Sequence, residues 1–93
     1  MNNNKILILE DEKIIAIDLQ RKLERFGYFV VGMTEQAEQA IELAKELNPD
    51  LLLSDIMLQG DADGITAAQY CYENLDIPTV FLTAFSDSQT LER

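Results

Sequence analysis

The sequence predicts a single α/β domain in which helices cover both faces of a parallel β-sheet. The first observation is a set of apolar runs of strand length, at about residues 5–9, 28–32, 51–54 and 78–82. The second is that segments of helical periodicity separate these runs, and strict alternation of strand and helix is typical of parallel sheets with right-handed crossovers. The third is the length of 93 residues, which allows no more than one domain.

The first part of the chain predicts two strands with a helix between them. The run at 5–9 has the continuous apolar character of a strand buried on both faces. A helix over residues 11–26 follows, and Gly27 is expected to end it. The run at 28–32 is β-branched and aromatic, as strands often are. The helix residues expected to face the sheet are Ile15, Leu19, Leu23 and Phe26.

A second helix and a third strand come next. Thr34 is expected to cap the helix at its N-terminus, and Asn48-Pro49 to end it. The strand covers about Leu51 to Ser54, and Asp55 lies at its carboxyl end. The apolar positions of the helix are Ala37, Ala40, Ile41, Ala44 and Leu47.

The rest of the chain predicts an acidic loop, a helix and a fourth strand. The loop covers residues 59–64, with Asp63 as a helix cap. The third helix runs from about Ile65 to Glu73, and the run at 78–82 is the fourth strand. Ser86 opens a capping box, so a fourth helix is expected there. The third helix is expected to direct toward the sheet the side chains of Ile65, Ala68 and Tyr72.

Oxygen-bearing side chains follow three of the predicted strands. Glu10 and Asp11 come after the first, Asp55 after the third and Thr83 after the fourth. Because open parallel sheets bind ligands beyond the carboxyl ends of their strands, we expect these side chains to form one site. Carboxylates held close together repel one another, and a hard divalent cation would stabilise them. Taken alone, Glu10 and Asp11 would equally suit the start of a helix, where the macrodipole favours acidic residues.

The composition is strongly acidic, and it narrows the possible functions. The net charge is −10, with 17 acidic against 7 basic residues, which argues against binding to nucleic acid or to an anionic membrane. The chain has no histidine, so no reaction can use an imidazole of its own. Cys71 is the single cysteine and no leader precedes the first strand, so we expect a cytoplasmic protein without an internal disulfide. No apolar run approaches the roughly 20 residues of a membrane-spanning helix.

Four features together resemble the receiver domain of two-component response regulators, over the chain from Lys5 to its end. The resemblance implies a flavodoxin-like doubly wound sheet with the strand order 2-1-3-4. It also implies a signalling switch with a protein-interaction surface. The four features are Glu10-Asp11, Asp55 within Leu-Leu-Leu-Ser-Asp-Ile-Met-Leu, Asp63-Gly64, and Phe81-Leu82-Thr83-Ala84.

The same resemblance implies a role for each site residue. Asp55 would be the phosphoacceptor. Its phosphoryl group would come from a histidine of a partner kinase or phosphotransfer protein. Mg²⁺ would be held by Glu10, Asp11, Asp55 and the backbone carbonyl of Met57. Thr83 would be the hydroxyl that binds the phosphoryl group and moves when the domain switches. The chain would accept a phosphoryl group and could remove it again by self-dephosphorylation. It would not be an enzyme.

Two departures from the family pattern are visible. Gln59 stands where the family usually has a proline. No lysine follows Lys45, and nothing after Thr83 supplies the family's fifth strand, with its lysine, or the fifth helix. We therefore expect residues 1–93 to form a receiver domain that is incomplete at its C-terminus. Its fourth strand would be an exposed edge that pairs with a second copy or aggregates.

Three other kinds of protein share part of this pattern: an interaction module, an aspartyl-phosphate phosphatase and a flavin-binding protein. An interaction module that is not phosphorylated would keep the fold; the intact acidic set favours the phosphorylated switch, and the missing lysine leaves the unphosphorylated module open. An aspartyl-phosphate phosphatase would have a second aspartate two residues after Asp55, where this chain has Met57. A flavin-binding protein would need a phosphate loop after the first strand, and the acidic residues there exclude it. Asp61 and Asp63 lack the spacing of an EF-hand, and Cys71 suits either packing or a neutral surface position.

Overall fold

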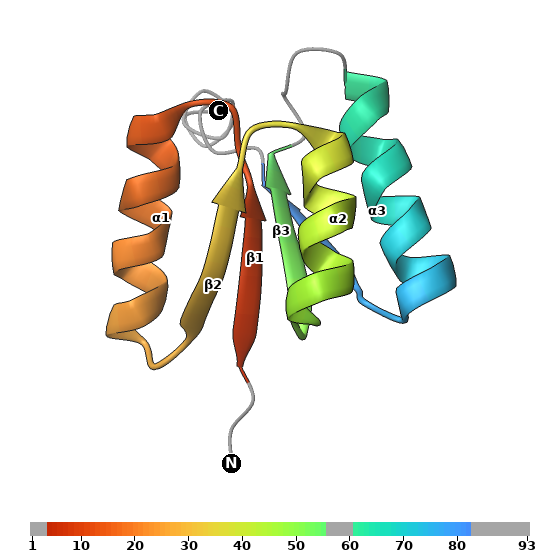
Figure 1. The fold of residues 1–93 in the computed structure, drawn as a ribbon. Coiled ribbons are helices and arrows are strands. Elements are labelled where there is room, and N and C mark those ends of the chain that lie inside the picture. The colour runs from red at the N-terminus through yellow and green to blue at the C-terminus, as the bar shows by residue number, and fades with distance from the viewer. Residues whose placement is uncertain (1–3, 56–60, 83–93) are drawn as a thin grey trace, which may run out of the picture.

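A computed structural model describes residues 4–55 and 61–82, in which four strands alternate with three helices (Figure 1). The predicted alternation is confirmed. Among these residues, no helix has the length and apolar character needed to cross a membrane. The fourth helix expected from Ser86 lies outside the described residues. The elements are β1 (Lys5–Leu9), α1 (Lys13–Arg25), β2 (Phe29–Thr34), α2 (Ala37–Leu47), β3 (Leu51–Asp55), α3 (Asp61–Leu75) and β4 (Thr79–Leu82).

The strands form one parallel sheet with the order β2-β1-β3-β4, which confirms the predicted order 2-1-3-4. β1 is a central strand and aligns Leu9 with Ser54 of β3. On its other side, Ile6 aligns with Val30 and Leu7 with Gly32, so the register shifts by one residue of β2. β2 and β4 are therefore the two edges of the described sheet, and only β2 carries this irregularity.

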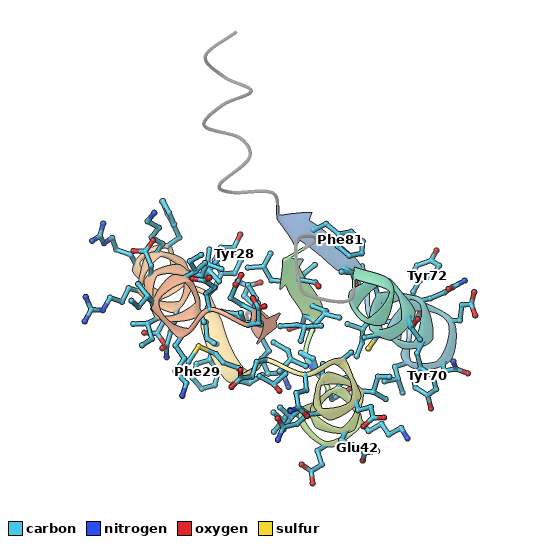
Figure 2. The ribbon with its side chains drawn as sticks, turned by 90° about the horizontal axis from the view of Figure 1, so that it is seen from above. Tyr28, Phe29, Glu42, Tyr70, Tyr72 and Phe81 are labelled. Carbon is cyan, nitrogen blue, oxygen red and sulfur yellow. The ribbon has the colours of Figure 1, made fainter. Side chains whose placement is uncertain are left out.

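Helices cover both faces of the sheet, and alternate residues of β1 pack into two separate cores. Figure 2 shows α1 on one side and α2 with α3 on the other. Ile6 and Ile8 pack on the α1 side with Ala16, whereas Leu7 and Leu9 pack against α2 and α3. This division follows from the two-residue period of a strand. Each buried Leu or Ile contributes roughly 1.5–3 kcal/mol, so β1 stabilises both layers.

Gly27 and Asn48, the residues expected to end α1 and α2, both lie in the left-handed region of φ and ψ. Gly27 has φ +95° directly after the last turn of α1, a conformation that glycine adopts without steric cost. Asn48 has φ +51° and is the C-cap of α2. Asparagine visits this region more readily than most residues do. The residues that end the two helices were therefore readable from the sequence, although α1 stops at Arg25, one residue earlier than predicted.

The predicted boundary between β2 and α2 is wrong. Thr34 is the last residue of β2 and does not cap α2, whose N-cap is Gln36. Thr34 aligns with Leu9 of β1, so pairing between strands outweighs the local preference of threonine for a helix cap. β2 accordingly runs over Phe29–Thr34 rather than 28–32.

Two residues of the predicted helix faces are exposed. Phe26 is 78% exposed because α1 ends at Arg25, before the position at which Phe26 would return to the sheet. Tyr72 is 65% exposed and points away from the sheet (Figure 2). The small side chains of Ala67 and Cys71 are buried instead, and small residues let a helix lie close to a sheet. The predicted burial of Ala68 is confirmed.

The helix α3 begins earlier than predicted. It starts at Asp61 rather than Ile65, so Asp63 lies inside the helix and is not its cap. The predicted loop is therefore wrong for residues 61–64. Gly64 thus lies within a helix, although glycine is unfavourable in helix interiors.

Candidate functional site

The carboxyl ends of β1 and β3 lie side by side at one end of the sheet, the upper end in Figure 1. Leu9 aligns with Ser54, and the residues that follow these two are Glu10 and Asp55. Asp55 is the last residue of β3 and aligns with Leu82 of β4. Ligands of open parallel sheets bind at this end.

Glu10 carries a buried carboxylate, since only 4% of the residue is exposed. Its backbone N–H donates to the carbonyl oxygen of Thr34 at 2.9 Å, one residue beyond the last aligned pair of β1 and β2. Its Oε2 accepts a hydrogen bond of 3.0 Å from the backbone N–H of Glu12. Burial of a carboxylate is unfavourable unless polar groups or a cation compensate it. A buried glutamate at a strand end therefore indicates a functional role.

Asp11 follows Glu10 and is half-buried. Glu12 is the N-cap of α1 and makes no capping hydrogen bond with its side chain, and the first turn of α1 contains no acidic residue. Glu10 and Asp11 thus both precede the helix. Interaction with the helix macrodipole does not explain why Glu10 is buried. The position of the pair favours a binding site over the helix-start interpretation.

The oxygen donors here fit a hard cation such as Mg²⁺, which proteins commonly bind through one or two carboxylates while it keeps several waters. Glu10 and Asp11 supply two adjacent carboxylate side chains. Among the described side chains, no three acidic or cysteine residues come together. The side chain of Asp55 lies outside the described part of the structure, as do Met57 and Thr83. The roles expected for these three residues stay predictions, and so does the binding of Mg²⁺ by Glu10 and Asp11.

Thr34 and Gln39 belong to the same region, and the sequence analysis missed them. Thr34 is buried, and its Oγ1 donates to Oε1 of Gln39 in α2 at 2.6 Å. The same oxygen accepts a hydrogen bond of 3.2 Å from the backbone N–H of Gln36. The pattern that could have predicted Thr34 is the same as for the other residues, namely an oxygen-bearing side chain at the carboxyl end of a strand. Thr34 did not fit this pattern because the strand was predicted to stop at Gly32.

A cleft of about 290 Å³ opens beside Glu10, between the start of α1 and the start of α2. Its polar lining includes the bonded pair Thr34 and Gln39 next to the buried Glu10. The remaining lining residues are Lys13, Ala16, Ile17, Met33 and Glu35.

Cys71 is fully buried in the core between α3 and the sheet, so of the two expected roles it has the packing role. Burial raises the pKa of its thiol above the ordinary value. The thiol is therefore neutral at pH 7. A neutral and inaccessible thiol is not a nucleophile, and Cys71 has no part in the site.

The parallel sheet, the helices on both faces and the buried carboxylate at the strand ends define a doubly wound α/β domain of the flavodoxin-like type. The sequence model of the response regulator receiver domain matches residues 6–93. The chain therefore belongs to the response regulator receiver domain family, a family of signalling modules that are generally not enzymes.

Two curated relatives illustrate the similarity. The phyllosphere-induced regulator PhyR of Methylorubrum extorquens is 34% identical over 84 residues, which cover 89% of this chain and 32% of that protein. The transcriptional regulatory protein PdtaR of Mycobacterium tuberculosis is 39% identical over 89 residues, which cover 96% of this chain and 43% of that protein. The chain thus spans less than half the length of either relative.

Solved structures show the same fold. The signal receiver domain of a modulated diguanylate cyclase from Desulfovibrio desulfuricans matches with a TM-score of 0.82 and 37% identity, covering 96% of this chain and 71% of that one. PhyR from Bartonella quintana, solved in complex with the anti-sigma factor NepR, matches with a TM-score of 0.80 and 34% identity. That match covers 91% of this chain and 35% of the PhyR chain.

Proposed function

We propose that this chain is the phosphoacceptor domain of a two-component system, in which Asp55 receives a phosphoryl group from a histidine of a partner kinase or phosphotransfer protein. The observation that supports this most directly is the alignment of Leu9 with Ser54, since it brings the strand ends that bear Glu10 and Asp55 together. Membership of the receiver family gives independent support. The cytoplasmic location expected from the sequence is part of the same proposal.

The chemistry follows from the residue types. A carboxylate oxygen of Asp55 forms a bond to phosphorus while the bond from phosphorus to the histidine nitrogen breaks, and the imidazole leaves with a proton. Glu10, Asp11, Asp55 and the backbone carbonyl of Met57 would hold Mg²⁺, which when bound offsets the negative charge of the phosphoryl oxygens. Thr83 would donate its hydroxyl to a phosphoryl oxygen and move with it, changing a protein-interaction surface. In self-dephosphorylation, water would later attack phosphorus while the bond from phosphorus to the Asp55 oxygen breaks, which releases inorganic phosphate with the protons of the water and restores the carboxylate.

Intact mass spectrometry after incubation with Mg²⁺ and a small acyl-phosphate donor tests the proposal. We expect a single phosphoryl adduct on the unmodified chain and none on the Asp55→Asn variant. Asp50→Asn is the matched control, because Asp50 lies at the opposite end of β3, where its Oδ2 accepts a hydrogen bond from the backbone of Lys5. Removal of Mg²⁺ with a chelator should abolish the adduct.

An adduct that survives in Asp55→Asn would contradict the assignment of the phosphoacceptor. The alternative is an interaction module that keeps the receiver fold and is not phosphorylated. A folded chain that binds Mg²⁺ but forms no adduct would support this alternative. The predicted incompleteness of the domain at its C-terminus stays a prediction.

Self-association through β4 is the second part of the proposal. Within the described sheet β4 pairs only with β3, its residues 79–82 carry no charge, and Val80 and Phe81 are exposed. An edge of this kind can pair with its own copy around a two-fold axis. Sedimentation velocity should show a dimer that grows with protein concentration and with salt, because salt screens the net charge of −10. A monomer under all these conditions would contradict the pairing.

A further inference from the structure

Glu10 and Asp11, the acidic pair that follows β1, are attached to β2 through the backbone of Glu10. The N–H of Glu10 donates to the carbonyl oxygen of Thr34 at 2.9 Å. This bond lies beyond Leu9, the last residue of β1, where the regular strand pairing stops. The position of the Glu10 backbone therefore depends on the direction of the Thr34 carbonyl. The position of the Glu10 carboxylate depends on it as well, because the side chain starts from this backbone.

The side chain of Thr34 holds the end of β2 against α2. Its Oγ1 donates to Gln39 at 2.6 Å and accepts from the N–H of Gln36 at 3.2 Å, so it bonds to α2 and to the N-cap of α2. Thr34 is buried, and water competes less with a hydrogen bond in such a place. Two bonds to one hydroxyl fix the orientation of the residue whose carbonyl receives Glu10.

These hydrogen bonds form a continuous series that links α2 through the end of β2 to Glu10. Glu10, Thr34 and Gln39 also line the same cleft, which confirms that the three residues are neighbours at one place on the surface. On the other side of Glu10, its Oε2 accepts from Glu12 at the start of α1. Glu10 is thus held between the start of α1 and the junction of β2 with α2.

We propose that Thr34 and Gln39 are positioning residues for the cation site, although neither contacts the cation. This inference rests on the proposed function, since it concerns the Mg²⁺ that Glu10 and Asp11 would hold. Loss of the Thr34 hydroxyl would free the end of β2 from α2, and the backbone of Glu10 would shift with it. Removal of groups behind metal ligands typically weakens metal binding by 10–100-fold, and the indirect link here puts the expected loss at about tenfold.

Calorimetric titration of the metal-free chain with Mg²⁺ tests this proposal. Thr34→Val keeps the shape of the side chain and removes the hydroxyl, and we expect the Kd for Mg²⁺ to rise about tenfold. Thr34→Ser keeps the hydroxyl and should bind Mg²⁺ as the unmodified chain does. Thr79→Val is the matched control, because Oγ1 of Thr79 is buried and has no hydrogen-bond partner in the described structure. Its affinity for Mg²⁺ should not change.

Gln39→Met is a second variant that tests the same hydrogen bond if Thr34→Val does not fold. Gln39 is exposed, so its replacement should leave the fold intact while removing the acceptor of the 2.6 Å bond, and circular dichroism checks this. Folded variants with unchanged Mg²⁺ affinity would overturn the inference and leave the proposed function standing. An equal loss in Thr79→Val would also overturn it, since the effect would then be general. No Mg²⁺ binding by the unmodified chain would overturn the proposed function and this inference with it.

Discussion

The two edges of the described sheet differ in backbone regularity more than in chemistry. Neither β2 nor β4 contains a charged residue. Figure 2 shows Phe29 at the β2 side and Phe81 at the β4 side, and Phe29 is the more exposed, at 62% against 39%. However, β2 has a register shift against β1, whereas β4 aligns with β3 without interruption. A bulge disrupts pairing with a further strand, so exposed apolar area alone does not predict which edge associates.

The largest effect should come from a charge placed on β4. Phe81→Lys should weaken self-association by about tenfold or more, or about 1.4 kcal/mol, because charged residues on an edge strand oppose pairing with a further strand. Met33→Lys on β2 is the matched control, since Met33 is 38% exposed and the change in charge is the same. It should leave association unchanged. Sedimentation velocity measures both, and an equal loss in the two variants would show that net charge, not the β4 edge, governs association.

The two edge strands also contain threonines with opposite surroundings. The buried hydroxyl of Thr79 has no partner in the described structure, whereas that of Thr34 makes two hydrogen bonds. Thr79→Val should therefore raise the free energy of unfolding by about 1 kcal/mol, and Thr34→Val should lower it by about as much. Urea unfolding without Mg²⁺, at a concentration where the chain is monomeric, measures both. Shifts of the same sign would contradict this difference between the edges.

The smallest effect concerns the thiol beneath the β4 side of the molecule. Cys71 lies in the α3 core, and its carbonyl accepts a hydrogen bond of 3.0 Å from the N–H of Ile77, just before β4. Burial raises the pKa of this thiol, so the folded state keeps its proton at a pH where the unfolded state loses it. Stability is then fully present below the unfolded pKa of about 8.5 and falls as pH rises through the folded value.

Cys71→Ala isolates this contribution, because it leaves the tyrosines and lysines unchanged. The difference in unfolding free energy between the unmodified chain and Cys71→Ala should be constant from about pH 6 to 8 and should narrow above about pH 8.5. Urea unfolding at each pH measures it. A difference that stays constant to pH 10 would mean that the thiol titrates alike in both states.

Most of the fold could be predicted because buried parallel strands leave a clear pattern in the sequence. The runs that became β1 and β3 are continuous and apolar, and the strand order follows from the family resemblance. The errors concern boundaries. Helical periodicity identified the face of α1 but not its last turn, which left Phe26 outside. Whether Thr34 caps a helix or extends a strand depends on Leu9, its partner in a distant part of the chain.

The candidate site could be predicted only in part, for a similar reason. That Glu10 and Asp11 directly follow β1 could be predicted, because it is a local pattern in the sequence. The bond between Thr34 and Gln39 was not found, because it joins two elements whose relative position is set by packing. The roles assigned to Asp55, Met57 and Thr83 come from the resemblance, and these roles stay predictions, as does metal binding by Glu10 and Asp11.

The central position of β1 also affects how the chain folds as it is synthesised. β1 is synthesised before β3, one of its neighbours in the sheet, and its residue Ile6 pairs with Leu51, about 45 residues later in the sequence. Pairing between such distant segments is slow, and unpaired apolar strands are prone to aggregate. We therefore expect the segment Ile6 to Leu9 to be the part of the nascent chain that a holding chaperone would bind.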